Sequence, residues 1–202
     1  MDLIQAVPST ISPGRDGGCF LLPVGIPKGG DYGGSGETAG FLLRRAGQLY
    51  CLDSRELFIW SECRRLPRMS ELLHEAARKL SLLASDIESI IGPLVAAHLI
   101  LQIGESDPWD DVKRLSPLPL IDEPEFGGGS NEGQADKLKP YYDLWYDLWL
   151  RFDGRTTLEA AVRELIPESG TSFSQAQRVS VALLFSLVRA GAVLVNPANK
   201  DC

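Results

Sequence analysis

The segment GQLYCLDSRELFIW, residues 47–60, changes its hydrophobic period halfway through. Residues 49–52 have the composition of a short half-buried strand. The second half has the spacing of an amphipathic helix, and Ser54 stands where its N-cap is expected. The segment therefore predicts a strand that runs into a helix with almost no loop between them.

Two more strands are predicted before this segment, at residues 19–24 and 40–45, and residues 48–52 form the third. Ala46 and Gly47 lie where a tight hairpin should turn. Three helices follow, so the predicted order is three strands and then three helices. The predicted helices cover residues 55–64, 70–83 and 86–98.

The second part of the chain repeats the first. HEAARKL (residues 74–80) aligns with EAAVREL (159–165), and LVAAHLIL (94–101) aligns with LVRAGAVL (187–194). The second copy is longer between these blocks, and we expect a loop at residues 166–175 to hold the extra residues. In this alignment His98 takes the place of Gly191, which predicts helix termination at both positions. The second set of helices is predicted at residues 141–152, 156–165 and 174–190, with an extended piece at 192–195.

Three segments follow from this pattern. Residues 18–105 and 140–198 are the two modules, and residues 106–139 are rich in proline, acids and glycine, as flexible linkers are. The predicted fold class is α+β, a tandem of winged helix-turn-helix modules. The first module is expected to have a small three-stranded antiparallel sheet and three helices, and the second to be mostly helical.

Composition and charge exclude several classes of protein. The chain has 202 residues, 44% of them hydrophobic, and a formal charge of −7, so we do not expect a nucleic-acid partner. No secretory signal or membrane span is recognisable, which predicts a cytoplasmic protein with no membrane partner. We find no motif of an enzyme, a metal site or a cofactor site, and therefore expect a non-catalytic chain. The four cysteines are scattered, at Cys19, Cys51, Cys63 and Cys202.

The first module resembles the PqqD family of peptide chaperones, and more broadly the precursor-recognition elements of ribosomally synthesised and post-translationally modified peptide (RiPP) pathways. The resemblance rests on residues 47–60, on MSELLHEAARKL (69–80) and on LVAAHLILQIG (94–104). It implies a leader-peptide-binding adaptor whose partners are a precursor peptide and a separate peptide-modifying enzyme. The peptide is expected to add as a strand to the third strand of the module, facing its third helix.

The resemblance also implies the residues of the peptide site. Because a strand has two faces, either Leu49 and Cys51 or Tyr50 and Leu52 point inward. The alternative for about half of the set is that the side chains only fill the core. The predicted set is Gln48, Leu49, Tyr50, Cys51, Leu52 and Asp53 on the strand side, and Ile87, Ile90, Ile91 and Leu94 on the helix side.

The first helix of the second module has more aromatic residues than one core face needs, which favours an interface with a partner. The alternative is that these residues cover Leu118 and Leu120. Two other functions stay open for the chain: a tandem winged-helix regulatory or scaffold protein that binds DNA or a protein, and a supporting subunit of an enzyme complex. The predicted interface consists of Tyr141, Tyr142, Trp145, Tyr146 and Trp149.

Overall fold

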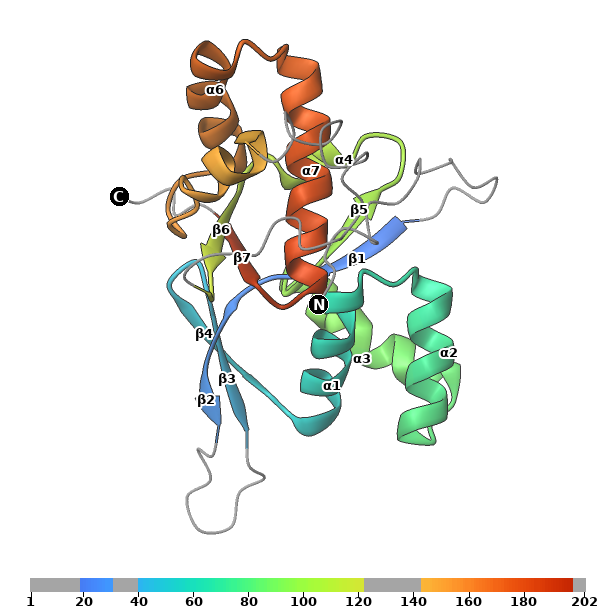
Figure 1. Ribbon diagram of the computed structural model, residues 1–202. Helices are drawn as coiled ribbons and strands as arrows, with labels where there is room; N and C mark the ends of the chain where they lie inside the picture. Colours follow the sequence, from blue (N-terminus) through green and yellow to red (C-terminus); the bar gives the residue numbers. More distant parts are fainter. Residues whose placement is uncertain (1–18, 31–39, 122–142, 198–202) are drawn as a thin grey trace, which may run out of the picture.

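The computed structural model describes residues 19–30, 40–121 and 143–197 (Figure 1). It confirms the α+β class, with small antiparallel sheets and helices packed around them. We call residues 19–104 the first half and residues 108–197 the second half. The predicted interface residues Tyr141 and Tyr142 lie outside the described residues.

The first half begins with four strands and continues with helices. The predicted helices are all present, although their ends differ by a few residues from the predicted ones. The elements are β1 (Cys19–Pro23), β2 (Ile26–Gly30), β3 (Phe41–Arg45), β4 (Gln48–Leu52), α1 (Ser54–Glu62), the 3-10 helix η2 (Cys63–Arg65), α2 (Met69–Leu80), α3 (Ala84–Ala96) and β5 (Ile100–Gly104).

The predicted three-stranded sheet exists, but its strands are β2, β3 and β4 in that order. β1 was expected in this sheet and instead pairs antiparallel with β5. Neither β5 nor β2 was predicted from the sequence. Pairing of β1 with β5 places the start of the first half beside its end. The β3–β4 hairpin turns at Ala46 and Gly47 as predicted, with φ of 47° and 82°.

The second half contains one strand that was not expected, besides the strand at the predicted extended piece. Residues 108–119 belong to the predicted linker, yet they form a short helix and a strand. The strand pairs antiparallel with β7 (Val193–Pro197), so the second half contains a two-stranded sheet, although most of its described residues are helical as predicted. A further helical segment covers residues 143–149. The other elements are α4 (Pro108–Val112), β6 (Leu115–Pro119), α6 (Leu158–Ser169), α7 (Phe173–Arg189) and β7 (Val193–Pro197).

The two halves have the same arrangement of elements. In each half, a strand that precedes the helices pairs with a strand that follows them. Pro23 pairs with Ile100 in the first half, and Pro119 pairs with Val193 in the second. The helix ends also match, because His98 and Gly191 have φ of 52° and 70°. Three backbone hydrogen bonds close each helix in the same pattern: Ala97 to Pro93, His98 to Val95 and Leu99 to Leu94 after α3, and Ala190 to Ser186, Gly191 to Val188 and Ala192 to Leu187 after α7.

The longer spacing in the second half is not held by a loop at residues 166–175. α6 continues to Ser169 and α7 begins at Phe173, so the connection is as short as the one between α2 and α3. Instead, α6 continues past Leu165, the residue aligned with the last residue of α2, and α7 has 17 residues where α3 has 13, so each of the two helices adds about one turn. Ser81 and Gly170 end α2 and α6 in the same left-handed conformation, with φ of 54° and 65°.

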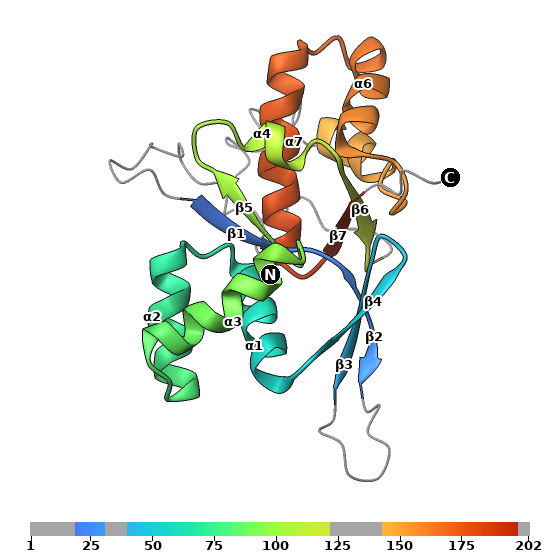
Figure 2. The same cartoon turned by 180° about the vertical axis from the view of Figure 1, so that it is seen from behind.

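The buried residues form two core clusters, and each contains residues of both halves. Leu22 and Ile103 of the first half are buried in the same cluster as Leu184 of α7. The Gly25 N–H donates to the Val195 carbonyl at 2.9 Å, which links the start of β2 to β7. α7 therefore lies along both halves rather than in a separate domain (Figures 1 and 2).

Candidate functional site

The candidate peptide site is built on β4, the outer strand of its sheet among the described residues. Asp53 explains why this strand runs straight into α1. Its carboxylate accepts hydrogen bonds from the backbone N–H groups of Arg55 and Glu56, both at 2.8 Å, and the Glu56 carboxylate accepts from the Asp53 N–H at 2.9 Å. This capping box begins the helix one residue earlier than the predicted Ser54 cap. The carboxylate of Asp53, a residue of the predicted peptide site, therefore caps α1.

The hairpin turn determines which backbone groups of β4 face outward. In a hairpin with a two-residue turn, the flanking pair exchanges both backbone hydrogen bonds, and bonded and non-bonded pairs then alternate. Arg45 and Gln48 are that flanking pair. Tyr50 and Leu52 are therefore bonded to β3, while the N–H and C=O groups of Leu49 and Cys51 point away from it.

The side chains of β4 divide between its two faces. Leu52 is 3% exposed and Tyr50 is half-buried, so these two point inward. Leu49 is 60% exposed and Cys51 is also exposed. The question that the sequence left open is settled in favour of Tyr50 and Leu52. The Cys51 sulfur packs against Gly40, where an added Cβ would overlap it.

The predicted helical side of the groove is mostly core. Ile87, Ile91 and Leu94 are at most 3% exposed and lie in one cluster with Leu52. Only Ile90 is partly accessible. α1 lies between β4 and α3 and packs against both (Figure 2). A peptide along β4 would therefore meet α1 before it meets α3.

A hollow of about 280 Å³ opens on another part of α3. Gly92 helps to form it, because a Cβ at this position would meet no atom within 4 Å. None of its lining residues belongs to β4. They are Met69, Glu88, Ile91, Gly92, Val95 and Gln102.

The predicted aromatic interface of the second half is partly core. Trp149 is 4% exposed and meets Phe152 edge-on at 6.2 Å between ring centroids. Trp145 is half-buried, while Tyr146 is 40% exposed. Of the aromatic residues described, Tyr146 is thus the most available to a partner.

The described titratable side chains include a buried cysteine and two histidines. Burial raises the pKa of the Cys63 thiol, and the nearby Glu62 carboxylate raises it further, which disfavours the reactive thiolate. His74 and His98 are exposed. Within the described ranges, no group of His, Cys, Asp and Glu is placed to hold a metal ion.

Two residues beside the β4 edge were not predicted from the sequence. Gly40 has no side chain and so leaves room for the Cys51 sulfur. Arg44 lies directly opposite Leu49 on β3. The pairing Arg44–Leu49 follows from the Ala46-Gly47 turn, so the sequence did contain a signal for it.

Comparisons of the chain with protein-family models, with curated proteins and with solved structures give no match. The resemblance to peptide-recognition elements therefore stays a prediction. None of the described helices is both long enough and apolar enough to cross a bilayer.

Proposed function

We propose that this chain is a non-catalytic cytoplasmic adaptor that binds a precursor peptide and presents it to a separate peptide-modifying enzyme. In this proposal the two halves are a tandem of winged helix-turn-helix modules of the PqqD-like class. The observation that carries the proposal is the outer edge of β4, where the backbone groups of Leu49 and Cys51 face outward.

The peptide adds to β4 as a fourth strand of the sheet β2-β3-β4. Its residues opposite Leu49 and Cys51 exchange backbone hydrogen bonds with them, and the residue opposite Tyr50 directs its side chain to the face near α1. Most of the affinity then comes from the main chain. Ile87, Ile91 and Leu94 support the site from the core instead of contacting the peptide.

A DNA-binding function receives little support from the third helix. In a winged helix this helix enters the major groove, where its neighbourhood must be basic. α3 contains Asp86 and Glu88 and neither lysine nor arginine. Peptide binding is therefore the function that we favour.

The test uses random ten-residue peptides displayed in a library and selected on the full chain. For a selected peptide, Leu49→Pro should weaken binding roughly tenfold to a hundredfold, about 1–3 kcal/mol, because it removes an outward N–H. Leu49→Ala is the matched control, since it truncates the same side chain and keeps the N–H. Equal losses in the two variants would contradict strand addition.

Amide hydrogen exchange tests the same mechanism without a mutation. The N–H groups of Leu49 and Cys51 should exchange quickly in the free chain and become protected when the peptide binds. The Tyr50 N–H, bonded to β3, should be protected in both states. Protection of Leu49 and Cys51 that does not change on binding would count against the proposal.

A further inference from the structure

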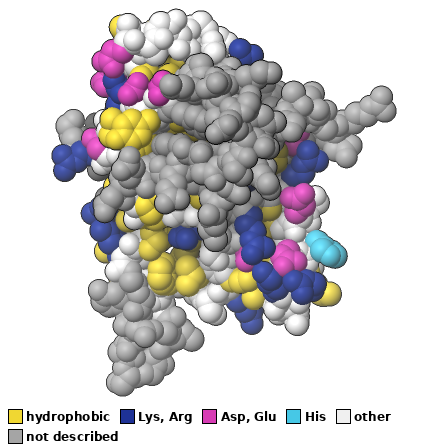
Figure 3. Space-filling view, in the orientation of Figure 1, with side chains coloured by type: hydrophobic (Ala, Val, Ile, Leu, Met, Phe, Trp, Pro, Cys, Tyr) yellow, Lys and Arg dark blue, Asp and Glu magenta, His cyan; other side chains and the backbone are white. Residues whose placement is uncertain are grey.

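The sheet that contains the β4 edge is basic in an otherwise acidic chain. Its strands carry Lys28, Arg44 and Arg45 and no carboxylate, whereas the whole chain has a formal charge of −7. Figure 3 shows Lys and Arg side chains beside hydrophobic ones over the β3–β4 hairpin. Within the described part of the chain, none of the three cations forms an ion pair.

Arg44 is the cation best placed to reach a strand on β4. It is exposed and lies directly opposite Leu49, so the two side chains share one face of the sheet. A peptide residue opposite Leu49 lies on that same face. Its backbone is two strand spacings from β3, about 10 Å, which the extended side chains of an arginine and a glutamate can bridge.

Arg45 and Lys28 add to the positive field from other positions. Arg45 flanks the turn, and its Nε is buried without a hydrogen-bond partner in the described structure. Lys28 is exposed on β2, the strand farthest from the edge, where solvent and salt screen its charge from a peptide.

We infer that the strand that binds β4 is an acidic peptide segment, with an Asp or Glu opposite Leu49. This inference rests on the proposed function and specifies the class of peptide. A peptide fits better than a nucleic acid because the edge presents N–H and C=O groups that another strand's backbone matches. Three cations on one small sheet are also fewer than a phosphate backbone commonly engages.

The experiment compares peptides from the same displayed library. We expect Asp and Glu to be enriched among peptides selected on the full chain. A labelled selected peptide should bind roughly fivefold more tightly than its version with Glu→Gln and Asp→Asn changes, and 0.5 M NaCl should reduce this difference. Because only the peptide is changed in this comparison, a difference in affinity cannot come from misfolding of the protein.

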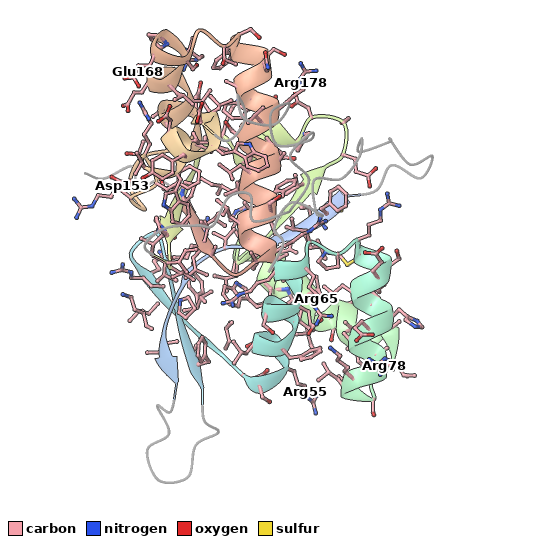
Figure 4. All side chains as sticks on the ribbon, viewed as in Figure 1. Arg55, Arg65, Arg78, Asp153, Glu168 and Arg178 are labelled. Atoms are coloured by element: carbon pink, nitrogen blue, oxygen red, sulfur yellow. The ribbon has the colours of Figure 1, made fainter. Side chains whose placement is uncertain are left out.

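Protein variants then locate the charge. Arg44→Gln should remove most of the difference between acidic and neutral peptides, and Lys28→Gln should remove less. Arg178→Gln is the control, because Arg178 is also exposed and lies at the far end of α7 from the hairpin (Figure 4). A loss with Arg178→Gln equal to that with Arg44→Gln would overturn a local role for the sheet.

The remaining outcomes separate this inference from the proposed function. Peptides that lose affinity in Leu49→Pro but show no acidic preference overturn the charge inference and leave strand addition intact. Selected peptides that are all insensitive to Leu49→Pro overturn the proposed function itself. A labelled single-stranded oligonucleotide that binds through Arg44 without needing the Leu49 N–H would make the ligand a nucleic acid. Self-association that Leu49→Pro abolishes would make the occupant a second copy of the chain.

Discussion

α3 and α7 hold the same place in the two halves, but their surroundings differ. α3 buries Ile87, Ile91 and Leu94 and leaves a face with Glu88 and Gly92 exposed. α7 is buried along most of its length, because both halves pack around it. α7 therefore contributes mainly to the core, whereas α3 leaves one face open, which agrees with our proposal that the first half is the one that binds a partner.

The largest loss of stability is expected from a cavity created in the core beside α7. Leu184→Ala removes a fully buried side chain and should lower the free energy of unfolding by about 2–5 kcal/mol. Because each of the two core clusters contains residues of both halves, amides of α1 and α3 should lose hydrogen-exchange protection by the same amount. Leu150→Ala, at a side chain 62% exposed, is the control and should change stability by less than about 0.5 kcal/mol. Separate unfolding of the first half would contradict the shared core.

The next effect tests the alternation of backbone groups along β4. Tyr50→Pro removes an N–H that bonds to β3 and should cost about 1–3 kcal/mol in urea denaturation. Leu49→Pro removes an outward N–H and should cost less than about 1 kcal/mol. The reverse order would mean that Leu49 and Cys51, not Tyr50, are bonded to β3. The assignment of the free edge would then be wrong.

A smaller effect concerns the matched helix ends. Gly191→Ala places a side chain at φ of 70° and should destabilise the chain by about 1 kcal/mol. His98→Gly relieves the same strain after α3 and should be neutral or stabilising, by at most about 1 kcal/mol. Gly92→Ala, inside α3 with open space around it, is the control and should stabilise by about 0.5–1 kcal/mol. Thermal unfolding measures all three changes, and the same sign for Gly191→Ala and Gly92→Ala would contradict the cap.

Local patterns predicted much of this fold. The Ala46-Gly47 turn, the strand that runs into α1 and the helix ends at His98 and Gly191 all depend on neighbouring residues. The pairing of β1 with β5 does not depend on neighbouring residues, because the two strands are far apart in the sequence. Hydrophobic periodicity predicts a strand but does not identify its partner. β6 was hidden by the prolines at positions 117 and 119, which are also typical of linkers.

The candidate site was predicted less completely than the fold. An apolar helix face looks the same whether it lines a groove or fills a core, so Ile87, Ile91 and Leu94 could not be assigned from the sequence. The Asp53 cap was misplaced by one residue because Ser54 is also a good N-cap residue. The charge of the sheet was missed because β2 and its Lys28 were not recognised as part of it.

The smallest effect compares two surface ion pairs, Glu75–Arg78 on α2 and Glu159–Arg163 on α6, with N–O distances of 2.7 and 2.8 Å. Hydrogen bonds from Arg78 and then Lys79 lower the pKa of Glu75 from 4.5 to about 2. Because the folded state favours the carboxylate, its contribution to stability is present above pH 4.5 and is lost as the pH falls toward 2. Arg78→Gln should move the NMR titration midpoint of Glu75 back toward 4.5, whereas Arg163→Gln, in the other half, should leave it unchanged. Solvent and salt screen the charges of this exposed pair, so the shift of the Glu75 pKa should be smaller in 1 M NaCl. A Glu75 midpoint near 4.5 in the unchanged chain at low salt would show that the ion pair does not persist in solution.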